Sequence, residues 1–131
     1  MVFHGFVPYD KFLMELKNMH LLLHPSLEES LGMCLVEAMA LGIPVIGGDR
    51  SGAVPWVLDY GKAGVLTNVR SAKAIGGALM EVLKNKTYYE KLSHCGQERV
   101  RKIFSPTAVA EAYEKMYTRA IAEALHPVLD R

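Results

Sequence analysis

The chain has 131 residues, of which 50% are hydrophobic and 22% charged, a composition typical of one globular domain and not of a disordered chain. Its net charge of +1 gives no overall attraction to nucleic acid, so no nucleic-acid partner is expected. The most apolar stretch, residues 33–48, is interrupted by Glu37, Gly42 and Pro44, whereas a transmembrane segment needs about 20 apolar residues. No transmembrane segment is therefore predicted.

The cysteines and the chain's organisation point to an ordinary intracellular domain. Cys34 and Cys95 lie far apart and belong to no CxxC or Cys/His cluster, so we expect reduced thiols in a cytosolic protein, with no disulfide and no metal site. The first residues lack the basic and long apolar regions of a signal peptide. No repeat or linker-like run divides the chain, so residues 1–131 are interpreted as a single domain.

The first half of the sequence alternates short apolar runs with helical spacing of apolar residues. The pattern predicts strands at residues 2–6, 20–24, 44–48 and 64–66. It predicts helices at residues 8–19, 33–41 and 53–58, with a loop at residues 25–31. Each predicted strand is followed by a predicted helix.

The second half is predicted to be wholly helical. Ser71 is expected to cap a helix whose inner face carries Ile75, Leu79, Val82 and Leu83. Thr87 and Glu90, three residues apart, predict a capping box for the next helix. Ser105 followed by Pro106 predicts the start of the last helix, which carries Val109, Tyr113, Met116, Ala120 and Ala124 at helical spacing.

This order of elements indicates an α/β fold. Short strands that alternate with helices pair in parallel through right-handed crossovers. Strands that are apolar throughout imply a sheet covered on both faces, hence a three-layered, Rossmann-like α/β/α domain with a short parallel sheet. Ligands of such sheets bind beyond the carboxyl ends of the strands, which points to residues 24–32 and 47–53.

The first of these segments carries residues suited to a nucleotide sugar. Glu29 lies in the predicted loop, where its carboxylate can accept hydrogen bonds from a polyhydroxylated ligand. The free N–H groups of Gly32, Met33 and Cys34 start a helix and suit a diphosphate. Glu37, one turn further, can accept two hydrogen bonds from a ribose. The residues alone leave an alternative open, because a Glu near a helix start also stabilises the helix dipole and an exposed loop Glu needs no ligand.

The wider sequence around these two carboxylates resembles a known family. Glu29 and Glu37 enclose seven residues within the frame Pro-Ser…Glu-Ser-Leu-Gly…Glu-Ala-Met-Ala-Leu-Gly-Ile-Pro-Val-Ile, which resembles the signature of family 4 glycosyltransferases and their retaining GT-B relatives. The segments Phe-His-Gly-Phe-Val-Pro at residues 3–8 and Ser-Gly-Ala-Val-Pro at residues 51–55 are similar to two further family elements. The resemblance covers residues 2–75 by motif and the helical remainder by pattern.

The resemblance implies a fold and a set of site residues. The chain would be the C-terminal, nucleotide-sugar-binding half of a GT-B fold. Glu29 would be the residue assigned to the catalytic site, where it would contact the donor hexose. Glu37 would bind the ribose. Backbone amides of Leu31, Gly32, Met33 and Cys34 would bind sugar hydroxyls and phosphates. Transfer in this class is thought to retain configuration without a protein nucleophile, so Glu29 would position the donor.

The resemblance also implies a reaction and its partners. A hexose would pass from a nucleotide-diphosphate sugar to an acceptor hydroxyl, in polysaccharide, lipopolysaccharide or glycolipid synthesis, without a metal or a cofactor. The family's acceptor-binding domain and phosphate-clamping Arg and Lys normally precede this segment, so the chain alone is expected to be inactive. The expected location is cytoplasmic, and peripheral association with the inner face of the membrane is an open alternative. Self-association through an exposed interdomain face is also left open.

The sequence has two other interpretations besides a glycosyltransferase. One is a non-catalytic nucleotide-binding or interaction module with a degenerate site. The other is a GT-B epimerase or phosphorylase, against which the Glu29–Glu37 frame argues.

Four residues outside the main motif have predicted roles of their own. Trp56 stands where the family usually has a Glu, and a core or interface position is favoured for it over a place under the nucleoside base. Arg50 and Lys62 are candidates for contact with a diphosphate, against the alternative that they are simply solvated. His24 is expected to hold the following loop by a hydrogen bond.

Overall fold

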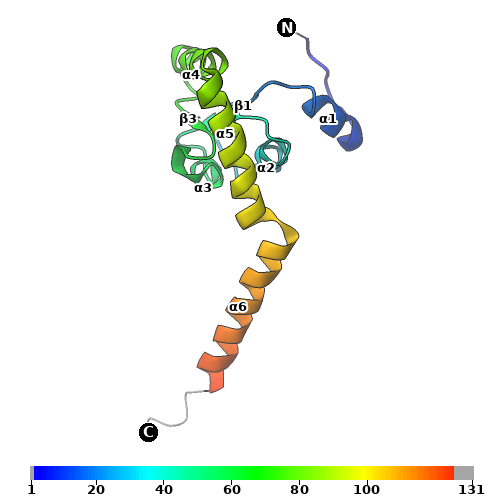
Figure 1. Cartoon of the computed structure of the whole chain (residues 1–131), viewed down its shortest axis with the longest axis vertical. Helices are drawn as coiled ribbons and strands as arrows, with labels where there is room; N and C mark the ends of the chain where they lie inside the picture. Colours follow the sequence, from blue (N-terminus) through cyan, green and yellow to red (C-terminus); the bar gives the residue numbers. More distant parts are fainter. Residues whose placement is uncertain (1, 126–131) are drawn as a thin grey trace.

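The computed structural model describes residues 2–125 and contains a small parallel sheet surrounded by helices (Figure 1). Its strands are β1 (Leu22–His24), β2 (Val45–Gly48) and β3 (Val65–Thr67). Its helices are α1 (Tyr9–Leu16), α2 (Met33–Ala40), α3 (Val54–Val57), α4 (Ala72–Lys84), α5 (Lys86–Arg99) and α6 (Pro106–Leu125), with a 3-10 turn η1 (Asp59–Gly61) and a π-helical segment η2 (Val100–Phe104).

The three strands pair in the order β1-β2-β3, and both pairings are parallel. Leu23 lies opposite Ile46, and Ile46 lies opposite Val65. The central strand β2 is buried over its whole length, whereas the edge strands β1 and β3 are half-buried. The predicted parallel α/β fold is confirmed, and the carboxyl ends of all three strands lie at one edge of the sheet.

Successive residues of the strands point to opposite faces of the sheet, and each face has its own hydrophobic cluster. Val45 and Leu22 pack into a cluster with α2 and α3, which includes the fully buried Leu35 and Leu58. Ile46 packs on the other face against α4 and α5, in a cluster that contains Ala78, Val82 and Leu92. The sheet is therefore covered on both faces, as the uniformly apolar strands predict.

The last helix lies outside this body. α6 follows η2 and extends away from the sheet and its covering helices (Figure 1). Its large apolar side chains are exposed, and they include Val109, Tyr113, Met116, Tyr117 and Ile121. The structure thus leaves an apolar face of α6 uncovered by the described residues. None of the helices in the described part is long and apolar enough to cross a membrane.

Three predictions about local structure are wrong. Residues 2–6 form no strand, because no neighbouring strand pairs with them and Gly5 adopts a left-handed backbone with φ of 64°. Helix α5 begins before Thr87, because the Asn85 side chain accepts a hydrogen bond from the Tyr88 N–H at 3.0 Å and caps it. Leu83 does not face the core and is 54% exposed. The caps at Ser71 and Ser105 are confirmed.

Candidate functional site

Two loops meet at the carboxyl edge of the sheet, one after β1 and one after β2. The hydroxyl of the buried Ser51 donates to the carbonyl oxygen of Ser26 at 2.6 Å, and the N–H of Ala53 donates to the carbonyl oxygen of Glu29 at 3.0 Å. Between them, Gly52 has φ of 55°, and a β-carbon there would collide with the same Glu29 carbonyl. The backbone of Glu29 is therefore fixed by the loop that follows β2.

The carboxylate of Glu29 is held by a chain of side-chain contacts. His24, the last residue of β1, has its Nε2 at 3.1 Å from Glu29 Oε2, and Cys34 Sγ lies 3.5 Å from His24 Nδ1. Burial, together with the negative charges of Glu29 and Glu37, raises the pKa of the Cys34 thiol, which keeps its proton for donation to Nδ1. Because a carboxylate only accepts hydrogen bonds, we assign the imidazole proton to Nε2, which donates to Glu29. The prediction that His24 holds the loop is confirmed.

The start of α2 offers backbone donors beside Glu29. Gly32 precedes the helix with φ of 77°, and a β-carbon there would approach Leu35 Cδ1 to 2.9 Å and Glu29 Cγ to 3.1 Å. Within the part of the chain that the structure describes, the N–H groups of Gly32 and Met33 donate to no acceptor. Free N–H groups at a helix start bind anions. The Leu31 side chain packs against the first hydrophobic cluster, so only its backbone is placed to bind a ligand.

Glu37 lies on the same helix and has a partner that the sequence does not reveal. The hydroxyl of Tyr9, on α1, donates to Glu37 Oε1 at 2.7 Å. This hydrogen bond is the main reason why the pKa of Tyr9 is raised. Burial, followed by the charges of Glu29 and Glu37, raises the pKa of Cys34, the second residue of α2. Glu29 and Glu37 thus each have a hydrogen-bond partner of their own, His24 and Tyr9.

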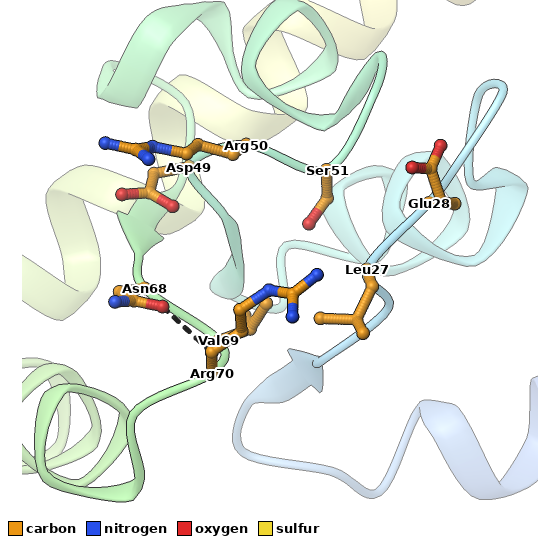
Figure 2. Close-up of a pocket in the computed structure, with 8 residues that line it drawn as sticks. All are labelled: Leu27, Glu28, Asp49, Arg50, Ser51, Asn68, Val69 and Arg70. Atoms are coloured by element: carbon orange, nitrogen blue, oxygen red, sulfur yellow. Dashed lines mark hydrogen bonds between the residues drawn. The ribbon is translucent and has the colours of Figure 1, made fainter.

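A cavity of about 380 Å³ lies at the carboxyl ends of β2 and β3. Its lining is polar and comes from three loops: Leu27, Glu28, Asp49, Arg50, Ser51, Asn68, Val69 and Arg70. Figure 2 shows the Arg70 guanidinium extending across the hollow, while Arg50 points away from its centre. The sequence analysis missed Asn68 and Arg70, which lie just beyond β3, although the rule that ligands bind beyond strand ends applies to β3 as well.

The remaining candidates divide between this edge and the far end of the domain. Arg50 lines the cavity beyond β2 and β3. Lys62 instead lies 3.9 Å from Asp59 and lines a separate cavity beside α5. Trp56 is 43% exposed and packs edge-on against Phe104 with the Arg99 guanidinium 5.3 Å from its ring centre. Neither Lys62 nor Trp56 belongs to the set of residues around Glu29.

Comparison with known sequences gives one family and several relatives. The model of the family described as "Glycosyl transferases group 1" matches residues 1–99. The chain is 31% identical over 105 residues to N-acetyl-alpha-D-glucosaminyl L-malate synthase of Bacillus anthracis, an alignment that covers 80% of this chain and 27% of that protein. It is 30% identical over 107 residues to the capsular polysaccharide biosynthesis glycosyltransferase CapM of Staphylococcus aureus, covering 82% and 28%.

Solved structures agree with the predicted fold. A sucrose-phosphate synthase from Thermosynechococcus elongatus matches with a TM-score of 0.77 and 25% identity, over 93% of this chain and 30% of that one. The C-terminal domain of a glycosyl transferase group 1 family protein from Francisella tularensis matches with a TM-score of 0.69 and 21% identity, over 78% and 52%. The second likeness concerns the fold alone. The chain spans little more than a quarter of the two curated relatives.

Proposed function

Because this chain belongs to the glycosyl transferases group 1 family, we propose that it is the donor-binding half of a retaining hexosyltransferase of family 4 type. In this proposal a hexose passes from a nucleotide-diphosphate sugar to an acceptor hydroxyl, in polysaccharide, lipopolysaccharide or glycolipid synthesis. The capsular polysaccharide glycosyltransferase among the relatives supports the first of these products. The protein would work in the cytoplasm, at or near the inner face of the membrane.

The observation that carries the proposal is the pair of carboxylates that flank the free start of α2. Glu29 is anchored by His24 and by the loop after β2, so its free oxygen lone pairs are presented in a fixed direction. The free N–H groups of Gly32 and Met33 supply donors for a diphosphate. Glu37 supplies an acceptor for a ribose diol further along the helix. Hexose, diphosphate and ribose follow one another in a nucleotide sugar, as these groups do along α2.

The same geometry argues for Glu29 as a positioning group. Its carboxylate accepts hydrogen bonds from His24 and from the Ser30 N–H at 3.2 Å. A carboxylate held in this way is suited to accept further hydrogen bonds from sugar hydroxyls, since each oxygen has two lone pairs. We assign Glu29 to the hexose, with the backbone amides of Leu31, Gly32, Met33 and Cys34 around it.

The chain is proposed to work with an acceptor-binding domain. It spans 27% of the length of one curated relative, and α6 exposes Tyr113, Met116 and Ile121 on a face that no described residue covers. Apolar faces of this kind are typical of interfaces. We assign this face to the acceptor-binding domain or to self-association of the chain, and the isolated chain is proposed to bind donor without transferring its sugar.

Titration of the chain with UDP, GDP and ADP and their common hexose conjugates tests the proposal, by calorimetry or ligand-observed NMR. Glu37→Ala should weaken binding of the nucleotide by tenfold or more, because a hydrogen bond to a charged group contributes about 1.5–3 kcal/mol. Glu29→Ala should remove only the additional affinity of the sugar conjugate. Glu111→Ala, an exposed carboxylate on α6, is the matched control. Failure of all three nucleotides to bind would overturn the proposal.

A further inference from the structure

Tyr9, the first residue of α1, is an exposed aromatic residue that is held by two contacts. It is 60% exposed, yet its hydroxyl donates to Glu37 Oε1 at 2.7 Å. Its ring also stacks on Phe12, with 6.5 Å between the ring centres and 30° between the ring planes. The two contacts therefore fix the direction of a ring that still presents much of its surface to solvent.

Helix α1 is anchored on the same hydrophobic cluster as α2. Leu16, at the end of α1, is 3% exposed, and Phe12 packs against the cluster that contains Leu35 of α2. The position of the Tyr9 ring relative to α2 therefore depends on core packing as well as on the hydrogen bond to Glu37. An aromatic ring at this position should remain beside Glu37 when its hydroxyl is removed.

The covalent structure of a nucleotide places its base close to any group that binds its ribose. The base is bonded to C1′, and the neighbouring C2′ carries one of the two ribose hydroxyls. A ribose bound to Glu37 therefore carries its base within reach of side chains that contact this carboxylate, and Tyr9 is such a side chain. The diphosphate would extend from C5′, at the other end of the ribose, towards the free N–H groups at the start of α2.

We propose that the exposed ring of Tyr9 is the platform on which the base of the donor nucleotide stacks. The inference rests on the proposed function, because it takes Glu37 as the group that binds the ribose. Every base has a π-face, so an aromatic ring contributes affinity to all of them, and the two-ring purines offer it the larger face. A ring that is already fixed loses little conformational freedom when the base binds.

Two variants separate the ring of Tyr9 from its hydroxyl. Tyr9→Phe removes the hydrogen bond to Glu37 and keeps the ring, whereas Tyr9→Leu removes both and keeps an apolar side chain. Calorimetry measures the binding of ADP, GDP and UDP to each variant, with inorganic pyrophosphate as the probe that has no base. Cooperative thermal unfolding shows that each variant is folded.

The nucleotides should bind Tyr9→Leu more weakly than Tyr9→Phe by about fivefold or more, the lower end of the range for a base stacked on an aromatic side chain. The difference should be larger for ADP and GDP than for UDP, and pyrophosphate should bind the two variants equally. Tyr117→Leu is the matched control, because Tyr117 is 59% exposed on α6, and it should bind like the natural chain. Nuclear Overhauser effects between the ring at position 9 and the base protons should be present in Tyr9→Phe.

The remaining outcomes distinguish failure of this inference from failure of the proposed function. Equal nucleotide affinities of Tyr9→Phe and Tyr9→Leu would refute the stacking role, and the proposed function would stand if Glu37→Ala still weakened binding. An equal loss for pyrophosphate would also refute it, because the damage would then extend to the start of α2. If the natural chain bound none of the three nucleotides, the proposed function and this inference would both be overturned.

Discussion

Replacement of His24 by Ala should separate the sugar contribution to donor binding from the nucleotide contribution. The imidazole donates to Glu29 at 3.1 Å, and the two side chains are 17% and 25% exposed. A hydrogen bond to a charged group contributes about 1.5–3 kcal/mol, and water that enters beside a partly exposed Glu29 would recover part of it. We expect a net loss of about 1–1.5 kcal/mol, or roughly 5- to 10-fold in affinity, confined to the sugar conjugate.

Calorimetry with a nucleoside diphosphate and its hexose conjugate measures both contributions on the same variant. His94→Ala is the matched control, because His94 is exposed on α5. Cys34→Ser keeps a proton donor for His24 Nδ1 and should retain most of the sugar affinity, whereas Cys34→Ala should lose part of it. An equal loss for the nucleoside diphosphate and its conjugate, or no loss for either, would refute the positioning role of His24.

Three further predictions concern the scaffold and are checked by thermal unfolding. Gly52→Ala should destabilise the protein by about 2 kcal/mol or more, because the left-handed backbone and the collision with a backbone carbonyl both oppose a β-carbon; an unchanged Tm would contradict this. Hydrogen bonding, above all from Arg101, lowers the pKa of Glu98 from 4.5 to about 2. Its carboxylate therefore stabilises the fold above pH 4.5, and the Tm advantage over Glu98→Gln should disappear as the pH falls towards 2, not persist there. Asn85→Ala should lower the free energy of unfolding by about 1 kcal/mol, and Thr87→Ala should lower it much less. A larger loss for Thr87→Ala would instead support the capping box predicted from the sequence.

The parallel sheet could be predicted because its signal is local. Runs such as residues 44–48 are short and apolar throughout, a pattern typical of a strand covered on both faces. Residues 2–6 have a similar composition, but a strand also needs a neighbour with which to pair, and composition carries no information about neighbours. The prediction of a cap at Thr87 for α5 failed for a related reason. Two competing N-cap signals lie within three residues, and the earlier one, Asn85, is used.

Only those residues of the candidate site that lie in one continuous segment could be predicted from the sequence. Glu29, Gly32 and Glu37 lie in a single motif, so their proximity follows from one loop and one helix. The contact between Tyr9 and Glu37 joins residues 28 positions apart, and the cavity joins three loops. Contacts of this kind depend on how the elements pack. The position of Arg70 was nevertheless accessible from the sequence, because it follows a predicted strand by a few residues.

The hydrogen bond from Tyr9 to Glu37 makes nucleotide binding an exchange reaction at this carboxylate. A ribose that binds Glu37 must displace the phenol from Oε1 or share the carboxylate with it. In the first case the measured affinity is the difference between two hydrogen-bonding states, and Tyr9→Phe should bind nucleotide more tightly than the natural chain. In the second case the phenol orients the carboxylate and its removal should weaken binding. The sign of that single change tells whether α1 competes with the nucleotide or helps to hold it.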